Sequence, residues 1–204
     1  MTPKDTYEQI YTKDPAVFGT TPSSLVLELA DLLPQGSTVL DLGAGQGKNA
    51  FYLANKGYRV TAVELTETGC QQMRDTAAKE GISLDACIEG DITSPEILAQ
   101  LKNYDAILCI NVLPLLTEEG VERVIAAIGE KTNPRGYMVI SAFMVESPGK
   151  RQVYVDKGKY RFVPEELRVR FSDFSIVSAY DEGLSHNCVD GKSRYVARLI
   201  AQKI

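Results

Sequence analysis

The chain has 204 residues, of which 44% are hydrophobic and 24% charged, and its formal net charge is −5. These values predict one globular domain with a full hydrophobic core, and the acidic balance argues against a nucleic-acid partner, whose phosphates attract a surplus of Lys and Arg. No apolar run approaches the ~20 residues of a membrane span, and the N-terminus lacks the apolar core of a signal peptide. We therefore expect a cytoplasmic protein with no membrane partner, and nothing in the chain calls for a partner subunit.

The first 36 residues are expected to form an N-terminal helical cap. A short helix near Tyr7–Tyr11 precedes a proline-containing turn, and a second helix runs over Ser23–Leu33. After this cap, apolar runs that predict strands alternate with amphipathic runs that predict helices. Such alternation implies βαβ units, a parallel sheet and right-handed crossovers.

The alternating segments lie between residues 37 and 143. The expected strands are Ser37–Leu42, Arg59–Glu64, Leu84–Glu89, Tyr104–Ile110 and Tyr137–Phe143. The expected helices are Lys48–Asn55, Thr66–Lys79, a short one opening at Ser94-Pro95, and Glu118–Lys131. A turn, Asn133-Pro134-Arg135-Gly136, is expected before the fifth strand.

Residues 144–204 follow a different rhythm. A short helix begins at Pro164, and two β-rich segments, Phe174–Tyr180 and Tyr195–Ala201, flank the turn signal Asp190-Gly191. Two strands around such a turn predict an antiparallel hairpin at one edge of the sheet.

The cysteines and the histidine predict no metal site. Cys70, Cys87, Cys109 and Cys188 form no CxxC pair, and the single histidine, His186, does not complete a Cys/His cluster by its spacing. Cys87 and Cys109 lie in apolar strand-like runs, where cysteine commonly acts as a small core residue. We expect reduced thiols.

The most informative segment is a glycine-rich turn. Residues Val39–Ala50 read VLDLGAGQGKNA, with Gly43, Gly45 and Gly47 between an apolar strand and the start of a helix. Such a turn presents backbone N–H groups and a helix N-terminus to a ligand. In a doubly wound α/β sheet, that ligand is a nucleotide-like cofactor.

Two details separate this turn from other phosphate-binding turns. The spacing is G-x-G-x-G rather than G-x-G-x-x-G, and Asp41 precedes the first glycine, where it can accept a hydrogen bond from an ammonium group. A P-loop is excluded, because Asn49 follows Lys48 where that motif requires Ser or Thr.

Polar residues also follow the next strands. Glu64 closes the second strand about 20 residues beyond the turn, where an acid binds a ribose diol. Asp91 follows the third strand, placed for an adenine amino group with the Ile92 N–H beside it, and Asn111 closes the fourth strand. All lie at strand carboxyl ends, where open α/β sheets bind ligands. Taken singly, each is equally explained as a helix N-cap or a turn residue.

These segments resemble a known family. VLDLGAGQGKNAFYLANKGYRVTAVE, starting at Val39, is similar to the first motif and following acidic strand end of class I S-adenosylmethionine-dependent methyltransferases. GDI (Gly90–Ile92), YDAILCINVL (Tyr104–Leu113) and NPRGYMVI (Asn133–Ile140) resemble that family's later motifs. The resemblance covers roughly residues 37–143.

The resemblance implies a fold, a cofactor and a set of binding residues. The fold is α/β, a Rossmann-like doubly wound seven-stranded sheet that is mostly parallel with an antiparallel last strand. The cofactor is S-adenosyl-L-methionine, which becomes S-adenosyl-L-homocysteine. The implied cofactor-binding residues are Tyr11, Asp41, Gly43, Ala44, Gly45, Asn49, Glu64, Leu65, Asp91, Ile92, Asn111 and Val112. Ala44 stands where many members have Cys, and binding there is by backbone.

Within that family, the chain looks most like the tellurite-resistance TehB-type small-molecule methyltransferases, in GQGKNAFYLANKGYRVTAVE, NYDAIL and the NPRGY turn. The resemblance implies that His186 and Arg194 of the C-terminal hairpin hold the methyl acceptor. A soft anion, such as tellurite, selenite or a thiol, needs cations, whereas a hydroxyl needs His186 as a general base. Asn187 replaces the usual Arg after the histidine. The competing interpretations are a loop residue without a role for His186 and a surface cation for Arg194.

The resemblance also divides a single methyltransferase domain over residues 1–204. Residues 1–36 form the cap, 37–143 bind the cofactor, and 144–204 form the substrate side. In the cap, Tyr11 would bind the cofactor's carboxylate and Phe18 would shield its methyl group, with core packing as the alternative for both. Arg151, Tyr154 and Tyr160 are candidates for the acceptor side.

Other functions stay open on the sequence. An O- or N-nucleophile on a small metabolite is one alternative acceptor, and a non-catalytic S-adenosylmethionine-binding module is another outcome. An NAD-dependent oxidoreductase shares the glycine turn and Glu64, but its glycine spacing differs. Methylation of nucleic-acid amino groups is disfavoured, because Asn111–Pro114 reads NVLP rather than a (D/N)PPY signature.

Overall fold

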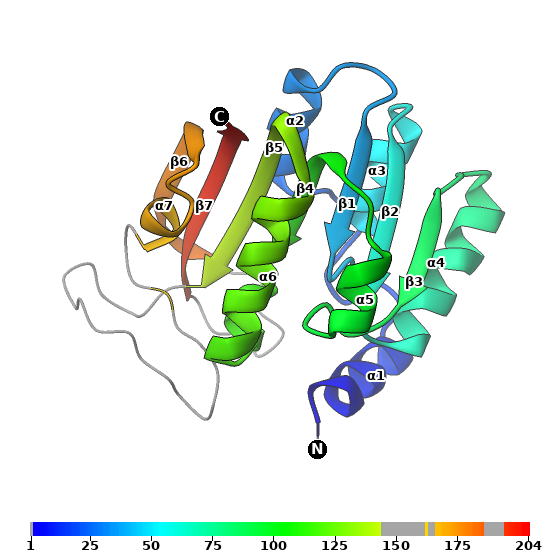
Figure 1. Ribbon diagram of the computed structural model, residues 1–204. Coiled ribbons are helices and arrows are strands. Elements are labelled where there is room, and N and C mark those ends of the chain that lie inside the picture. Colours follow the sequence, from blue (N-terminus) through cyan, green and yellow to red (C-terminus); the bar gives the residue numbers. More distant parts are fainter. Residues whose placement is uncertain (1, 144–161, 163–165, 186–193) are drawn as a thin grey trace.

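The computed structural model describes residues 2–143, 162, 166–185 and 194–204 (Figure 1). Its centre is a seven-stranded sheet of order β3-β2-β1-β4-β5-β7-β6. The strands are β1 Thr38–Leu42, β2 Arg59–Glu64, β3 Ala86–Glu89, β4 Tyr104–Ile110, β5 Thr132–Phe143, β6 Phe174–Ser185 and β7 Arg194–Lys203. β1 to β5 pair in parallel, and β7 runs antiparallel to both of its neighbours, β5 and β6. The expected fold class, hairpin included, is confirmed.

Helices cover both faces of this sheet. They are α1 Pro3–Lys13, α2 Ser24–Leu32, α3 Lys48–Asn55, α4 Glu67–Glu80, α5 Pro95–Gln100, α6 Glu118–Lys131 and α7 Glu166–Arg170, with a 3-10 turn η1 at Leu113–Leu115. Because side chains alternate along a strand, Val39 of β1 packs with α2, α3 and α4 on one face, and Leu40 packs with α6 and α7 on the other. The sheet therefore lies between two apolar layers.

The N-terminal helix is longer than the sequence analysis expects. It begins at Pro3 rather than near Tyr7, because Thr2 and Asp5 form a capping box in which each side chain accepts the other's backbone N–H. Figure 1 places α1 beside α4, at the edge of the sheet where the parallel strands end.

The fifth strand also starts earlier than expected. Thr132 already pairs with Tyr104, so the NPRG segment is part of β5 rather than a turn before it. The register shifts before Tyr137 pairs with Ala106, and Arg135 has a φ of 61°. The turn chemistry therefore produces a bulge inside a strand. None of the described helices is long and apolar enough to cross a bilayer.

Candidate active site

The glycine turn joins β1 to α3 at the carboxyl edge of the sheet. Gly43, Gly45 and Gly47 have φ values of 72°, 60° and 89°, a region that favours glycine. A Cβ on Gly43 would lie 2.4 Å from Cγ2 of Val112, and one on Gly45 would lie 3.1 Å from the Tyr11 hydroxyl. The left-handed backbone therefore favours glycine at all three positions, and at Gly43 a side chain would also clash with Val112.

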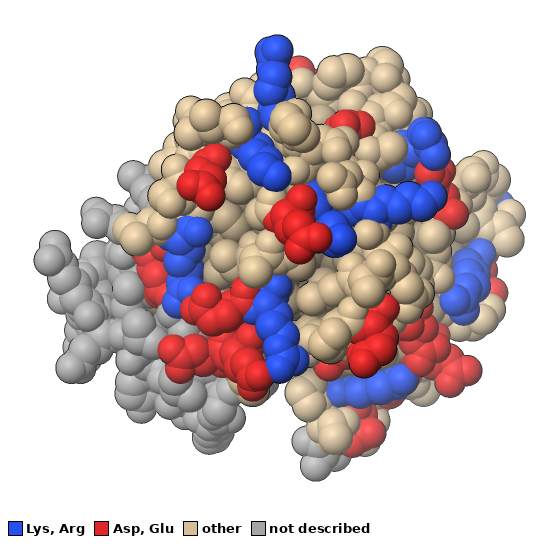
Figure 2. All heavy atoms as spheres, viewed as in Figure 1, with Lys and Arg blue, Asp and Glu red and all other residues tan. Residues whose placement is uncertain are grey.

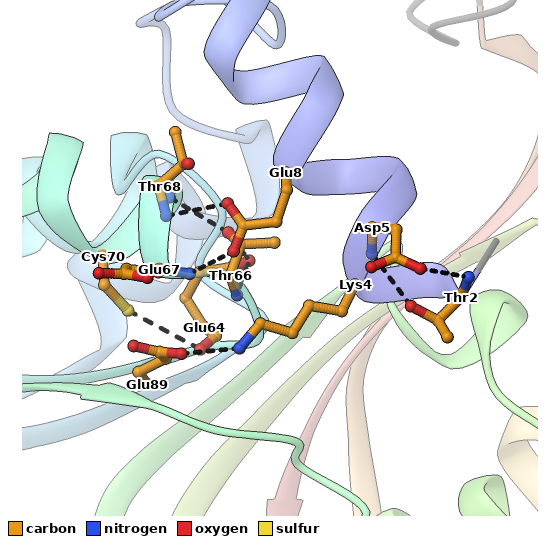
Figure 3. A network of polar contacts seen from close by, with 11 residues as sticks. Thr2, Lys4, Asp5, Glu8, Glu64, Thr66, Glu67, Thr68, Cys70 and Glu89 are labelled. Carbon is orange, nitrogen blue, oxygen red and sulfur yellow. Dashed lines mark hydrogen bonds and ion pairs between the residues drawn. The ribbon is translucent and has the colours of Figure 1, made fainter.

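Glu64 lies beside this turn at the end of β2 and is 4% exposed. Its Oε2 accepts the Gly45 N–H at 2.9 Å, and its Oε1 accepts the Thr66 N–H at 3.0 Å and the Thr66 hydroxyl at 2.7 Å (Figure 3). Burial raises the pKa of Glu64, and these hydrogen bonds oppose that change. The carboxylate is thus fixed in one orientation against the glycine turn. Leu65, which follows it, is half-buried.

Asp41 is the second buried acid at this edge. It is 1% exposed, and within the described part of the chain its Oδ2 has no hydrogen-bond partner. Burial, and then the charge of Glu64, raises the pKa of Asp41 to about 7. A buried carboxylate oxygen without a donor is costly, and such groups concentrate at functional sites.

The loops after β3 and β4 complete the edge. Asp91 is exposed, and its Oδ1 accepts the Thr93 N–H at 2.8 Å and the Thr93 hydroxyl at 2.7 Å, while the neighbouring Ile92 side chain packs in the core. Asn111 has a φ of 61°, and its Oδ1 accepts the Ser141 hydroxyl at 2.7 Å. Its left-handed backbone turns the chain so that Val112 lies against Gly43.

Asn49 has a contact that the sequence does not reveal. The side chain is buried, and its Oδ1 accepts the Ser23 N–H at 2.9 Å, next to the start of α2. The neighbouring Lys48 Nζ donates to the Phe18 carbonyl at 2.9 Å, and burial lowers the pKa of this lysine. The first turn of α3 is therefore hydrogen-bonded to the N-terminal cap.

The ring of Tyr11 covers the glycine turn. Tyr11 is 4% exposed, and its ring centroid lies 5.8 Å from that of Tyr7 and 6.1 Å from that of Phe18. Burial, with the charge of Glu64, raises the pKa of Tyr11. The Tyr11 carbonyl accepts a hydrogen bond from Gln72 of α4 at 2.9 Å. The cap thus places the Tyr11 hydroxyl at the glycine turn, with the Phe18 ring in edge contact with that of Tyr11.

Two charged residues attach α1 to the strand ends, and sequence reasoning missed both. Glu8 accepts the Glu67 N–H at 2.7 Å and the Thr68 N–H at 3.1 Å, so it caps α4 from another helix (Figure 3). Lys4 Nζ lies 2.8 Å from Glu89 Oε1, in an exposed ion pair. These contacts span about 60 or more residues, and no local pattern signals them.

The predicted acceptor residues lie mostly beyond the described part of the chain. His186, Arg151, Tyr154 and Tyr160 are outside the described residues. Arg194 begins β7, two residues before Val196, which pairs with the last residue of β5, Phe143. The backbone of Arg194 is therefore at the edge that carries the glycine turn.

The surface seen in Figure 2 has Lys and Arg interspersed with Asp and Glu, with no broad basic field on that face. Among the described residues, no group of three or more His, Cys, Asp or Glu could hold a metal ion. The candidate site in the described part of the chain therefore centres on the two buried acids beside the glycine turn, Asp41 and Glu64.

Residues 4–195 match a family model described as "Tellurite resistance protein TehB". The chain belongs to the TehB family. A curated relative, the probable S-adenosyl-L-methionine-dependent methyltransferase TehB of Haemophilus influenzae, is 37% identical over 106 residues, which are 52% of this chain and 36% of that protein. Hemagglutinin 1 of Eikenella corrodens is 31% identical over 170 residues, covering 82% of this chain and 53% of that protein.

The TehB fold is also evident from a solved structure. The crystal structure of TehB from Haemophilus influenzae has a TM-score of 0.77 and 26% identity, covering 97% of this chain and 67% of that chain. The match to curated TehB spans about a third of the relative's length, 36%. This TehB-family domain therefore has the Rossmann-like architecture of its S-adenosylmethionine-dependent relatives.

Proposed function

We propose that this TehB-family chain is an S-adenosylmethionine-dependent methyltransferase that acts on a small molecule. The observation that carries the proposal is Asp41, a buried acid whose Oδ2 lacks a donor beside Glu64 and the glycine turn. The α-amino group of S-adenosylmethionine would satisfy that oxygen, and Glu64 would accept the ribose hydroxyls. The residues present at this edge therefore fit the cofactor.

The chain's contribution is binding and the exclusion of water. When bound, S-adenosylmethionine supplies an electrophilic methyl carbon on its sulfonium sulfur. Gly43 and Gly45 allow close approach to the backbone, and the aromatic cluster of Tyr11 and Phe18 covers the turn. Holding two reactants in one orientation in a site closed to water accounts for much of the rate of such transfers.

For the methyl acceptor, we infer a chalcogen oxyanion such as tellurite or selenite, or a thiol, held by His186 and Arg194. The family description and the position of Arg194 at the start of β7 support this inference. Such nucleophiles need little base catalysis, so two cations are a sufficient site. The alternatives are an O- or N-nucleophile of a small metabolite, with His186 as general base, and a non-catalytic S-adenosylmethionine-binding module.

Calorimetry with S-adenosylhomocysteine tests the cofactor site. Asp41→Ala is expected to weaken binding at least tenfold, because the ammonium group loses its carboxylate. Asp105→Asn is the matched control, since Asp105 is a hydrogen-bonded acid near the opposite ends of the strands. Absence of binding to the unaltered protein at millimolar ligand, or unchanged affinity of Asp41→Ala, contradicts the assignment.

A methyl-transfer screen with mass spectrometry of the products tests the acceptor. The panel contains tellurite, selenite, thiols, phenols and amines. For an anionic acceptor, His186→Ala and Arg194→Ala are expected to raise KM more than they lower kcat, because both residues bind the ground state. Full activity of both variants on the best acceptor refutes their role, and binding of cofactor without any turnover favours the non-catalytic module.

We also propose that residues 1–204 form one methyltransferase domain and that the protein is cytoplasmic. The carboxyl-edge contacts of α1 support residues 1–36 as a cap on a cofactor-binding unit, with residues 144–204 as the acceptor side. The described cysteines, Cys70, Cys87 and Cys109, are free thiols, as in proteins of a reducing cytoplasm.

A further inference from the structure

Two thiols from different elements meet next to Glu64. Cys70 lies in the first turn of α4, and Cys87 is the second residue of β3. The Cys87 thiol donates to the Cys70 carbonyl oxygen at 3.8 Å, so the two residues are in direct contact. Cys70 Sγ lies 3.8 Å from the Glu64 carbonyl oxygen (Figure 3). The pair is thus positioned between a helix and a strand that pack together.

The surroundings of these thiols make them chemically unequal. Cys70 is fully buried and Cys87 is half-buried, so a small reagent reaches Cys87 first. The neighbouring Cys70 side chain lowers the pKa of Cys87 to about 7; burial opposes this change, and the positive charge of Arg74 reinforces it. Arg74 is held there by a 3.3 Å hydrogen bond from its Nη2 to the Cys87 carbonyl. An accessible thiolate beside a guanidinium is the environment of reactive cysteines.

Cys109 provides the contrast within the same chain. It is fully buried on β4, and burial raises its pKa to about 12. A buried thiol of high pKa is a poor nucleophile. Reactivity toward oxidants is therefore expected at Cys87 and not at Cys109.

We propose that Cys70 and Cys87 are a redox-active pair that forms a reversible disulfide, with Cys87 as the thiol that attacks a hydroperoxide first and Cys70 as the resolving thiol. The pair needs no methyl transfer, so this assignment stands independently of the proposed activity. Because the Cys87 thiol contacts the Cys70 carbonyl oxygen within one folded chain, the expected disulfide is intramolecular.

The reaction with hydrogen peroxide balances in two steps. The Cys87 thiolate attacks one peroxide oxygen, an S–O bond forms, the O–O bond breaks, and hydroxide leaves and takes up a proton to become water. Cys70 sulfur then attacks the Cys87 sulfenic acid, an S–S bond forms, the S–O bond breaks, and the Cys70 proton leaves in a second water. Two thiols lose two electrons and peroxide gains them. A dithiol reductant reverses the bond by exchange.

Oxidation changes a contact at the candidate active site. In the dithiol form the Glu64 carbonyl oxygen accepts from Cys70 Sγ and from the Gly90 N–H, the latter at 2.9 Å. The disulfide has no S–H, so the first of these hydrogen bonds is lost. Oxidation of the pair therefore removes a hydrogen bond at the end of β2, where the buried acid Glu64 lies.

The test is peptide mapping of the folded full chain. The protein in a Cys188→Ser background is treated with hydrogen peroxide, its free thiols are alkylated, and the protein is digested without reduction. We expect loss of two thiols and two mass units, a peptide that joins Cys70 to Cys87, and return of both thiols after dithiothreitol. Alkylated Cys70 and Cys87 with no linked peptide, or a link from either to Cys109, overturns the proposal.

Two variants in that background assign the roles. In Cys70→Ser, Cys87 is expected to stop at the sulfenic acid, which a 1,3-dione such as dimedone traps; in Cys87→Ser, Cys70 is expected to stay reduced. Cys109→Ser is the matched control, and it keeps the Cys70–Cys87 link. Trapping of a sulfenic acid at Cys70 in Cys87→Ser reverses the assigned order and refutes it. If Cys70→Ser does not fold, the mapping of the Cys188→Ser protein still decides.

Discussion

At the scale of single residues, Asp41 is held in a state that costs stability. Its pKa of about 7 in the folded protein lies above the 3.8 of a free aspartate, so the folded state binds the proton more tightly. Stability attributed to this group is therefore present at low pH and falls as pH rises from about 4 to 7. Such a cost persists at positions that serve binding rather than folding.

Replacing Asp41 should reveal that cost. Asp41→Asn is expected to raise the free energy of unfolding by about 1–3 kcal/mol at pH 8 and to leave it nearly unchanged at pH 4. Urea unfolding at both pH values measures the difference. Asp105→Asn is the control, for which the opposite effect is expected. Burial raises the pKa of Asp105, but hydrogen bonds from Thr38 and Asn133 outweigh burial and lower it. The Asp105→Asn variant should therefore lose stability at pH 8. A gain for Asp41→Asn that is equal at both pH values contradicts the ionisation argument.

The glycine turn offers a second test at this scale. Gly43→Ala is expected to destabilise by about 2–4 kcal/mol, because it combines a left-handed backbone with a Cβ 2.4 Å from Val112. Gly36→Ala separates the two effects: its φ is 78° with nothing within 4 Å of the added Cβ, and about 1 kcal/mol is expected.

A second substitution, at Val112, should restore part of the stability that Gly43→Ala loses. Val112→Ala should recover part of the Gly43→Ala loss in the double variant, since the clash is with the Val112 side chain. Urea unfolding of the four proteins gives the coupling energy. Strict additivity of the two substitutions would place the cost of Gly43→Ala in the backbone alone.

At the scale of elements, features set by local sequence signals could be predicted, and features set by contacts distant in the sequence could not. The β1–glycine turn–α3 unit has the expected strand and helix limits within a residue, because its signals, an apolar run followed by three glycines, are local in the sequence. The start of β5 could not be predicted, since Thr132 joins the sheet by pairing with Tyr104 across the fold. The role of Asn49 toward Ser23 has the same cause: the partner is distant in sequence.

The attachment of α1 to α4 is the element-scale contact most open to test. Glu8→Gln weakens a cap that accepts two backbone N–H groups, and about 1 kcal/mol of stability is expected to be lost, with faster amide exchange confined to α1 and the first turn of α4. Glu80→Gln, at the exposed far end of α4, is the control. Unchanged exchange in α1 would mean that the Lys4–Glu89 ion pair, the Gln72 hydrogen bond and Tyr11 packing hold the helix without Glu8.

At the scale of the whole molecule, the mostly parallel sheet with its antiparallel hairpin was predictable from the sequence, and the site only partly so. Alternating strands and helices dictate a parallel core, and acids after successive strands then share one edge by topology. Asp41 and Glu64 meet at this edge as expected. How α1 covers this edge depends on its contacts with α4, and a contact between two helices separated by two strands and two other helices has no signature in either segment.

Ligand binding at the carboxyl edge of the sheet should raise the stability of the whole protein. A ligand that binds only the folded state adds about 2.7 kcal/mol to the free energy of unfolding at 100 times its Kd. On the proposed function, S-adenosylhomocysteine should raise the Tm and NADH should not, because the G-x-G-x-G turn with Asp41 suits an amino-acid cofactor rather than a pyrophosphate. Thermal unfolding with each ligand measures the shift, and Asp41→Ala, compared at its own ligand-free Tm, should remove most of it. A shift with NADH alone would assign the edge to a dinucleotide and refute the methyltransferase.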